Sequence, residues 1–360
     1  MPQKTICLIN YTLNVGGAER QTADLANYFA SKNYKVFIII LRKGASFYKL
    51  DDRVICMEPG FYESRSKLGK LIYFLKIGVY VRSTILKLKP GIIFNTAFPS
   101  FILFFTIGIK IPFYLSIRCD PTITPRIEMF NIPLKIRQLL YRRCTGIIAQ
   151  TNYAKEILSK QFKHSTVSII PNILSNVSNE PFVRENMILS VGRLVKSKGF
   201  NYLIQAFARV ENESWKVVIL GEGPERANLE NLIKQMNLTD KILLVGTKSN
   251  TLEYYRKSKI FAFVSLSEGF PNALLEAMGS PLPSISFNCN AGPRDMIEDG
   301  VNGFLITMYD IDQYVAKLQL LMKDENLRNR FMEASIKLRV KHHSDKICNE
   351  YLMITEKNRL

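Results

Sequence analysis

The chain has 360 residues, of which 47% are hydrophobic and 22% charged, and its formal net charge is +18. This length suits about two globular domains, and the composition excludes a disordered or collagen-like chain. Residues 1–175 contain 25 lysine or arginine residues and 9 aspartate or glutamate residues, so they carry +16 of the total charge. This asymmetry predicts that the first half faces a polyanion, either nucleic acid or an anionic membrane.

The six cysteines follow no metal-binding or redox spacing, and the chain begins without the long apolar segment of a signal peptide. Both features favour a protein of the reducing cytoplasm. The most apolar stretch, residues 97–109, is shorter than the ~20 residues that span a bilayer. We interpret it as a buried helix between strands, with an interfacial helix as the alternative.

The first half alternates short apolar runs with helical stretches, a pattern typical of parallel β-α-β units. A helical stretch runs from Ala18 to Ser31. The runs of strand length are residues 5–10, 35–40, 91–95, 112–117 and 146–150.

The stretch from Ser64 to Cys119 contains nine basic residues and no acidic residue. Its spacing predicts a helix whose core-facing residues are Leu68, Ile72, Leu75, Val79 and Leu86. Another face mixes cations with apolar groups, as suits a membrane headgroup region, and consists of Lys67, Lys70, Leu71, Phe74, Val81, Arg82, Ile85 and Lys89. We therefore expect the first domain to dock on an anionic membrane, with a solvated helix face as the alternative.

The second half repeats the alternation, with strands expected at residues 187–191, 216–220, 242–245, 260–264 and 283–287. From Asp310 onward the pattern predicts helices only. We expect an α/β protein of two doubly wound, Rossmann-like domains facing across a cleft, with C-terminal helices. The expected domains are an acceptor and membrane domain (1–172), a hinge rich in Asn, Ser and Pro (173–186), a nucleotide-sugar domain (187–340) and a C-terminal helix (341–360) that could return to the first domain.

Ligands of such sheets bind at the carboxyl ends of the strands. After the first strand, Gly16 and Gly17 precede a helix, where backbone N–H groups and the helix N-terminus favour an anion. The loop has no G-x-G-x-x-G motif and no P-loop lysine, which argues against dinucleotide binding and Walker-type ATP binding. An ordinary strand-to-helix turn is the alternative.

Two loops of the second half carry charged groups. In "SVGRLVKSKGF", Arg193 and Lys198 lie in one strand-to-helix loop, where two cations can hold a diphosphate; the alternative is a solvated basic loop. In "SEGFPNALLEAM", Glu268 ends a strand and Glu276 lies on the same helix face as Asn272. Glu276 is suited to accept hydrogen bonds from two ribose hydroxyls, and Glu268 to lie beside a sugar ring.

These motifs resemble a known family. "SEGFPNALLEAMGS" is similar to the Glu-x7-Glu signature of the family 4 retaining glycosyltransferases, which have the GT-B fold. "SVGRLVKSKG", "LGEGPER" and "GPRDMIEDGVNGFLI" resemble the accompanying motifs in order and spacing, and "NVGGAER" resembles the N-terminal glycine loop. The likeness is strong over residues 187–306 and thin over residues 45–150. The overall build resembles bacterial transferases that extend lipid-linked oligosaccharides.

The resemblance implies a role for each residue of these loops. Arg193 and Lys198 would bind the donor diphosphate, and Glu268 would contact the donor sugar. Glu276 would bind the ribose. Backbone amides for the sugar and phosphate would come from the segment Gly269, Phe270, Pro271 and Asn272.

The resemblance also places Gly16 and Gly17 near the diphosphate and the acceptor. Many family members have a histidine near the end of the fourth strand that contacts the donor sugar. This chain has "SIRCDP" there, so Arg118 or Asp120 would serve instead. The three histidines are badly placed for that role and are expected on the surface: His164, His342 and His343.

The resemblance implies transfer of a hexose or N-acetylhexosamine, with retention, from a nucleoside-diphosphate sugar to a lipid-linked saccharide in bacterial surface polysaccharide or O-antigen assembly. UDP-GalNAc is the favoured donor and GDP-mannose its competitor. The family favours front-face attack, in which a phosphate oxygen takes the proton of the acceptor, and a carboxylate nucleophile stays open.

No cofactor or metal is expected, because Asp310 in the sequence Asp310–Asp312 is better placed as a helix N-cap than as part of a D-x-D metal site. The expected partners are the nucleotide sugar, the lipid-linked acceptor and the anionic inner face of the cytoplasmic membrane, without nucleic acid. Two alternatives are a nucleotide-sugar 2-epimerase of the same fold and a basic nucleic-acid-binding protein, although no recognition module of the latter is visible.

Overall fold

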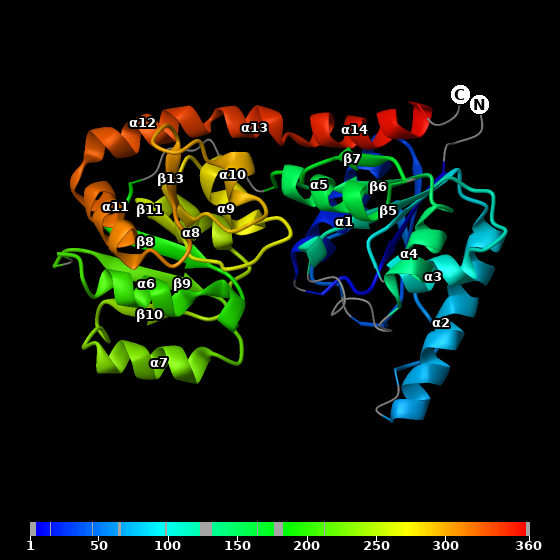
Figure 1. The fold of residues 1–360 in the computed structure, drawn as a ribbon, viewed down its shortest axis with the longest axis horizontal. Coiled ribbons are helices and arrows are strands. Elements are labelled where there is room, and N and C mark those ends of the chain that lie inside the picture. Colours follow the sequence, from blue (N-terminus) through cyan, green and yellow to red (C-terminus); the bar gives the residue numbers. More distant parts are fainter. Residues whose placement is uncertain are drawn as a thin grey trace. The chain divides into compact units, whose positions relative to one another are not determined.

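The computed structural model describes residues 5–14, 16–44, 46–63, 66–97, 99–122, 132–163, 165–175, 183–211 and 213–357. It divides into two compact units, which we call unit 1 (residues 1–173 and 344–360) and unit 2 (residues 174–343). Each unit contains one parallel sheet with helices packed on both of its faces (Figure 1). The expected doubly wound α/β architecture is confirmed.

The sheet of unit 1 has the strand order β3-β2-β1-β4-β5-β6-β7. Neighbouring strands of this described sheet are parallel. Its strands are β1 (Thr5–Asn10), β2 (Lys35–Ile40), β3 (Val54–Met57), β4 (Ile92–Asn95), β5 (Phe113–Ile117), β6 (Gly146–Ala149) and β7 (Val167–Ile169).

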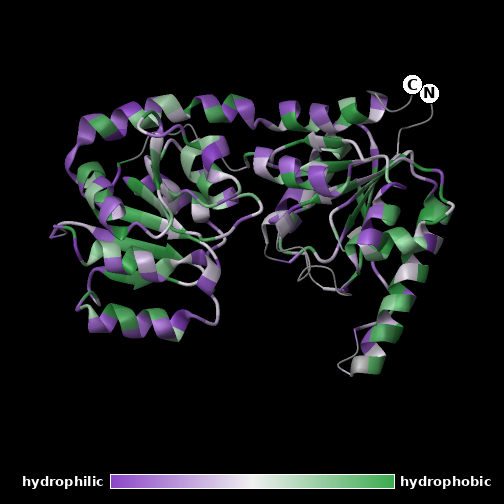
Figure 2. Cartoon of the chain, in the orientation of Figure 1, coloured by the Kyte–Doolittle hydropathy of each residue, from purple (hydrophilic) through white to green (hydrophobic). Residues whose placement is uncertain are grey.

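Both faces of this sheet are buried, which explains why its strands are continuous apolar runs rather than alternating ones. Ile6 and Leu8 of β1 belong to one hydrophobic core, whereas Cys7 and Ile9 belong to the other. Figure 2 shows the hydrophobic residues concentrated on the strands.

The helices of unit 1 are α1 (Gly17–Ser31), α2 (Lys67–Leu88), α3 (Pro99–Phe105), α4 (Leu134–Tyr141), α5 (Asn152–Gln161) and the C-terminal α14 (Ser344–Lys357). Helix α14 is packed into unit 1 although it follows all of unit 2 in the sequence. The rings of Tyr351 and Phe94 are 5.2 Å apart, and the Tyr114 hydroxyl donates to the Ile354 carbonyl.

Helix α2 turns the opposite face to the core from the one predicted. Phe74, Val81 and Ile85, which we expected at a membrane, are at most 5% exposed. The face that we assigned to the core (Leu68, Ile72, Leu75, Val79 and Leu86) is 45–69% exposed. The prediction was wrong because α2 is apolar on both faces, so its periodicity could not identify the inner one.

Gly78 marks the buried side of α2. A Cβ atom at Gly78 would lie 2.3 Å from the Phe105 ring, so the glycine allows α3 to pack closely against α2. Arg82, expected as a membrane cation, donates instead to the carbonyl groups of Phe105 and Ile107. Its charge thus stabilises the C-terminal end of α3.

Unit 2 has the strand order β10-β9-β8-β11-β12-β13. Its strands are β8 (Met187–Val191), β9 (Lys216–Leu220), β10 (Ile242–Leu244), β11 (Ile260–Phe263), β12 (Ser284–Phe287) and β13 (Gly303–Ile306). Its helices are the 3₁₀ turn η2 (Lys196–Lys198), α6 (Phe200–Phe207), α7 (Arg226–Gln235), α8 (Thr251–Lys257), α9 (Asn272–Gly279), α10 (Pro293–Met296), α11 (Ile311–Lys323), α12 (Glu325–Ser335) and α13 (Lys337–Lys341).

The ten predicted strands are confirmed, four of them (β1, β2, β8 and β9) with the expected bounds. Three further strands were missed: β3, β7 and β13. All three are edge strands of three or four residues, and β3 is partly exposed, so they lack the long buried run that identified the others. Within the described residues, no helix has the length and apolar character needed to cross a membrane.

The described residues of the predicted hinge that follow Ile173 include two that are bonded into unit 2. Leu174 belongs to a hydrophobic core of that unit, and its N–H donates to the His342 carbonyl. Arg184 donates to the carbonyl groups of Ser258, Ser280 and Pro281. Residues 176–182 lie outside the described part of the chain.

Candidate active site

Three loops at the carboxyl edge of the unit 2 sheet are joined backbone to backbone. Gly221, after β9, has a φ of 142°, and a Cβ atom there would lie 1.9 Å from the Gly192 carbonyl oxygen. A Cβ atom at Gly223 would lie 2.3 Å from the Leu194 carbonyl oxygen, and the Gly221 N–H donates to Gly246. Only glycine permits these contacts, so the "LGEGPER" motif positions the loop that carries Arg193 and Lys198.

Gly199 positions Lys198 next to the end of β11. It adopts the left-handed conformation with a φ of 64°, and a Cβ atom there would lie 2.2 Å from the Val264 carbonyl oxygen. The Leu266 N–H also donates to Ser197. The loop after β8 is thereby held against the segment that leads to Glu268.

The structure brings Lys198 and Glu268 together, although they are 70 residues apart in the sequence. Lys198 Nζ lies 2.5 Å from Glu268 Oε1, and their side chains are 20% and 9% exposed. Arg193 is exposed in the same loop. The ammonium group keeps further N–H groups for an anion, so the loop offers two cations beside a carboxylate.

The segment between Glu268 and α9 is partly buried. Phe270 is 8% exposed and packs in the hydrophobic core, so it can contribute only its backbone. Within the described chain, the N–H groups of Gly269 and Phe270 donate to no backbone carbonyl. The Asn272 N–H, expected to face a ligand, donates to the Phe270 carbonyl instead. Pro271 has no N–H group, so the backbone amides that could bind an anion are those of Gly269 and Phe270.

Helix α9 begins at Asn272 and carries Glu276 one turn later. The two residues share a helix face and are both partly buried. The carboxylate of Glu276 therefore lies on the helix whose N-terminus follows Glu268, as the sequence predicted.

Residues after β12 complete this edge and were missed as site residues. A Cβ atom at Gly292, whose φ is 100°, would lie 2.1 Å from the Pro271 ring, so the loop closes onto the segment after Glu268. Burial of the Cys289 thiol, helped by the Glu268 carboxylate and opposed by the Lys198 ammonium group, raises its pKa to about 12. The thiol is therefore neutral. The signal was the motif "GPRDMIEDGVNGFLI", which we had used only for the resemblance.

In unit 1, Gly16 and Gly17 lie where β1 leads into α1. The Tyr48 hydroxyl donates to the Gly16 carbonyl and accepts from its N–H, so this amide is already used. The Glu19 carboxylate lies against Gly16, in the first turn of α1. An anionic ligand at this helix N-terminus would therefore compete with Glu19.

Arg118 and Asp120, the expected substitutes for the family's histidine, are both engaged within unit 1. Arg118 donates to Asn172 Oδ1 and to the Tyr351 hydroxyl. Burial raises the pKa of that hydroxyl, so Tyr351 stays neutral and can accept. Asp120 is 6% exposed and accepts from the N–H and hydroxyl of Thr122. Arg118 thus links β5 to the end of unit 1, and Asp120 stabilises its own loop.

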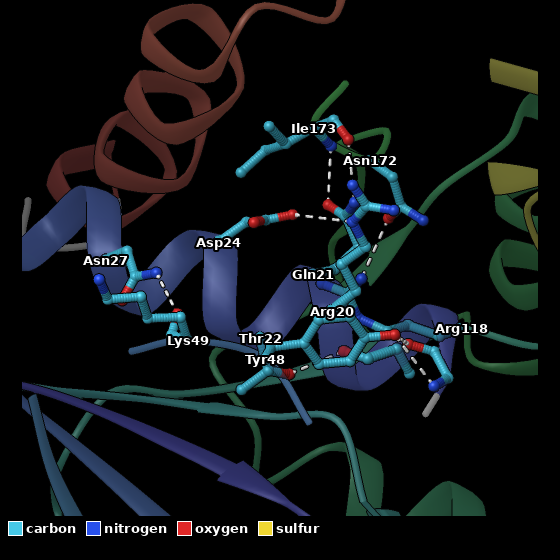
Figure 3. Close-up of polar contacts among 12 residues, drawn as sticks. Arg20, Gln21, Thr22, Asp24, Asn27, Tyr48, Lys49, Arg118, Asn172 and Ile173 are labelled. Carbon is cyan, nitrogen blue, oxygen red and sulfur yellow. Dashed lines mark hydrogen bonds and ion pairs between the residues drawn. The ribbon is translucent and has the colours of Figure 1, made fainter. Parts of the chain in front are cut away.

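A further contact that the sequence did not indicate links α1 to the unit boundary. The buried Gln21 side chain donates to the Ile173 carbonyl at 2.9 Å and accepts from its N–H at 2.7 Å (Figure 3). Ile173 is the last residue of unit 1 before the chain enters unit 2. Helix α1, which follows the Gly16–Gly17 loop, is therefore hydrogen-bonded to the residue at which the chain passes from unit 1 into unit 2.

The remaining polar predictions have mixed outcomes. His342, expected on the surface, is 2% exposed, because its ring packs 6.0 Å from Phe270. His343 is exposed as expected, and His164 lies outside the described residues. Asp310 is confirmed as an N-cap, since its side chain accepts from the Gln313 N–H.

Solved structures of the same architecture identify the class. S. aureus TarM, solved in complex with Fondaparinux, alpha-GlcNAc-glycerol and UDP, superposes with a TM-score of 0.81 at 16% identity, covering 98% of this chain and 100% of TarM. Anabaena HepE in complex with UDP superposes with a TM-score of 0.79 at 16% identity, covering 99% and 100%. With its paired parallel-sheet units and charged carboxyl edge, the chain has the GT-B glycosyltransferase fold.

Two family models match consecutive parts of the chain. "Glycosyltransferase Family 4" matches residues 15–174, and "Glycosyl transferases group 1" matches residues 175–338. The chain is therefore a glycosyltransferase whose first part matches the family 4 model and whose second part matches the group 1 model.

Two bacterial relatives match nearly the full length of the chain. It is 29% identical to the amylovoran biosynthesis glycosyltransferase AmsD of Erwinia amylovora, over 92% of this chain and 93% of AmsD. It is 28% identical to an alpha-1,4-N-acetyl-D-galactosaminyltransferase of Campylobacter jejuni, whose name gives a diphospho-undecaprenol-linked saccharide as its acceptor, over 91% of each chain.

Proposed function

We propose that this glycosyltransferase moves an N-acetylhexosamine or hexose, with retention, from a UDP sugar to a hydroxyl group of a lipid-linked saccharide. The observation that carries the proposal is the Lys198–Glu268 pair with Arg193 in the same loop. It puts cations and a carboxylate side by side at the sheet edge where ligands of this topology bind.

The leaving group of the reaction is a nucleoside diphosphate, so negative charge develops on its phosphate oxygens. Arg193 and Lys198 are suited to neutralise that charge, together with the N–H groups of Gly269 and Phe270. Glu276, on α9, is suited to bind the ribose hydroxyls. No metal ion is needed in this scheme, since the cations of the loop stabilise the diphosphate.

Glu268 serves this reaction best as a binding group. Its carboxylate is paired with Lys198, which weakens it as a nucleophile and directs the ammonium group toward the diphosphate. The acceptor hydroxyl would then attack on the face from which the diphosphate leaves, and a phosphate oxygen would take its proton. This route gives retention of configuration.

The relatives support the choice of donor and acceptor. The Campylobacter relatives are named as N-acetylgalactosaminyltransferases that act on undecaprenol-linked saccharides, and HepE is solved with UDP-glucose. We therefore favour UDP-GalNAc as donor and an assembly role in a bacterial surface polysaccharide or glycan. The enzyme would work in the cytoplasm, bound peripherally to the inner face of an anionic membrane.

The test is a screen of purified protein against UDP and GDP sugars, with a short-chain polyprenyl diphosphate saccharide as acceptor. We expect a new glycosidic bond from one UDP sugar, and NMR of the product should show the anomeric configuration of the donor. Isomerised free nucleotide sugar would instead identify a 2-epimerase. Inverted configuration would refute the front-face route, and no turnover with any nucleotide sugar would refute the proposal.

A further inference from the structure

We infer that the outer faces of α2, α3 and α4 form one surface that docks on an anionic lipid bilayer. We call it the docking surface. It rests on the proposed function in one respect, because a lipid-linked acceptor is available only at a membrane. Apart from Leu71, its apolar residues differ from those that the sequence indicated, because the core covers the other face of α2.

The centre of the docking surface is an exposed apolar stripe on α2. The spacing of its residues keeps them on one face of the helix over more than four turns. Each is at least 45% exposed: Leu68, Leu71, Ile72, Leu75, Val79 and Leu86. Single exposed apolar residues are ordinary on protein surfaces, but several of them on one helix face, as from Leu68 to Val79, mark an interaction surface.

The two neighbouring helices extend this stripe. Helix α3 packs against α2 on one side and against α4 on the other (Figure 1). Phe104 and Ile107, at and just after the end of α3, are 42% and 43% exposed. Helix α4 exposes Leu134, Ile136 and Leu139 by 42–63%. The apolar residues are thus spread over three adjacent helices, and Figure 2 shows α2 with hydrophobic residues along its length.

The charge of the docking surface is entirely positive. The sequence has no acidic residue from Ser64 to Cys119 or from Leu134 to Lys155. Exposed cations beside the apolar residues are Lys76, Lys87, Lys135, Arg142 and Arg143. A second copy of the chain would bring like charges together, because a two-fold interface pairs a patch with itself. Anionic headgroups complement this fringe, while the acyl region accommodates the leucines.

The docking surface reaches the edge of the sheet where unit 1 is expected to bind its substrate. Helix α2 connects the parallel strands β3 and β4, so its N-terminal half lies at their carboxyl edge. The Tyr73 hydroxyl confirms this position by donating to Leu41, the residue after β2. The Gly16–Gly17 loop follows β1 at the same edge. Docking would therefore hold that loop close to a bilayer carrying the acceptor.

The test is flotation of the full chain with vesicles of phosphatidylethanolamine and phosphatidylglycerol, compared with vesicles of phosphatidylcholine alone. We expect the wild type to float with the anionic vesicles only. Replacement of Leu75→Glu with Val79→Glu should lower the partition coefficient at least tenfold. Replacement of Lys76, Lys87 and Lys135 by glutamine should lower it by roughly a hundredfold.

The matched control is Leu320→Glu, which changes a leucine that is 40% exposed on a helix of unit 2 and should leave flotation unchanged. Nucleotide-sugar hydrolysis should be equal in all variants. Flotation of the Leu75→Glu, Val79→Glu protein at the wild-type level would overturn the inference. A second result would also overturn it: the wild type does not bind vesicles but forms a dimer in light scattering, and these two substitutions dissociate that dimer. Vesicle binding without turnover of any nucleotide sugar would leave the docking surface standing and refute the proposed function.

Discussion

The two units share one strand order but use the carboxyl edge of the sheet differently. In unit 2, glycines join the edge loops backbone to backbone and hold the Lys198–Glu268 pair, with Arg193 exposed beside it. In unit 1, Arg118 and Asp120 at the corresponding edge bond to neighbouring residues of the same unit. The topology thus decides where a ligand can bind, whereas the residues of the loops decide which edge presents charge.

The net charge of the two units does not follow the charge of their sheet edges. Unit 1 has most of the positive charge, and part of that charge lies on the outer helices α2 and α4, although Arg42 and Lys43 follow β2 at the sheet edge. Unit 2 is nearly neutral, yet its few edge charges are positioned by the backbone. Position, and not net charge, therefore distinguishes the proposed diphosphate site from the proposed docking surface.

The sharpest test of this contrast is removal of both cations from unit 2. Arg193→Ala with Lys198→Ala should lower turnover by at least about a thousandfold, because a single transition-state donor is worth roughly 10²–10³ in kcat. The measurement is steady-state transfer, with circular dichroism to verify folding.

The control for that variant is Lys257→Ala. Lys257 pairs with Glu253 at 2.6 Å, but both side chains are 49% exposed. We expect unchanged turnover. Near-normal activity in the folded double variant would show that Arg193 and Lys198 do not bind the diphosphate. The contrast between the two units would then no longer hold.

Glycine substitutions compare the backbones of the two units. Gly199→Ala should destabilise the protein by about 2–4 kcal/mol, through left-handed strain and a clash with Val264. It should also reduce turnover, because Lys198 must move. Gly78→Ala clashes only with the Phe105 ring and should cost about 1–3 kcal/mol while leaving donor hydrolysis intact. Denaturant unfolding and turnover of both variants check this, and equal losses of activity would contradict it.

The ribose role of Glu276 can be measured directly. Glu276→Ala should weaken UDP binding by about 2–3 kcal/mol, the range for hydrogen bonds to a charged group. Calorimetry with UDP and GDP is the measurement, and the exposed Glu298→Ala in the same unit is the control. Unchanged affinity for both nucleotides would exclude Glu276 from the site.

The smallest expected effect concerns the link between Gln21 and Ile173. Gln21→Ala should destabilise unit 1 by about 1–3 kcal/mol, because it leaves the N–H and carbonyl of Ile173 buried without their partner. Affinity for UDP should not change, since the proposed site for the nucleotide is in unit 2. Thermal unfolding and calorimetry test both parts, and a large loss of UDP affinity would show that the units are not separable in this way.

Much of the fold was accessible from the sequence because its signals are local. Continuous apolar runs such as residues 35–40 indicate strands buried on both faces, and glycines beside Arg193 and Glu268 indicate loops at a sheet edge. The sequence therefore predicted these loops at the sheet edge without knowledge of their contacts. The roles of their side chains as ligand groups stay predictions.

Only the tertiary structure decided the features that depend on distant partners. Helix α2 is apolar on two faces, and the packing of α3 against Gly78 selects the inner one. The residues around Arg118 in the sequence do not indicate its partners, but in the folded chain its guanidinium donates hydrogen bonds to Asn172 and Tyr351. The short strands β3, β7 and β13 exist because a neighbouring strand supplies their hydrogen bonds. Periodicity reports which residues can be buried, but the free energy of burial depends on which surfaces meet, and that is a property of the folded chain.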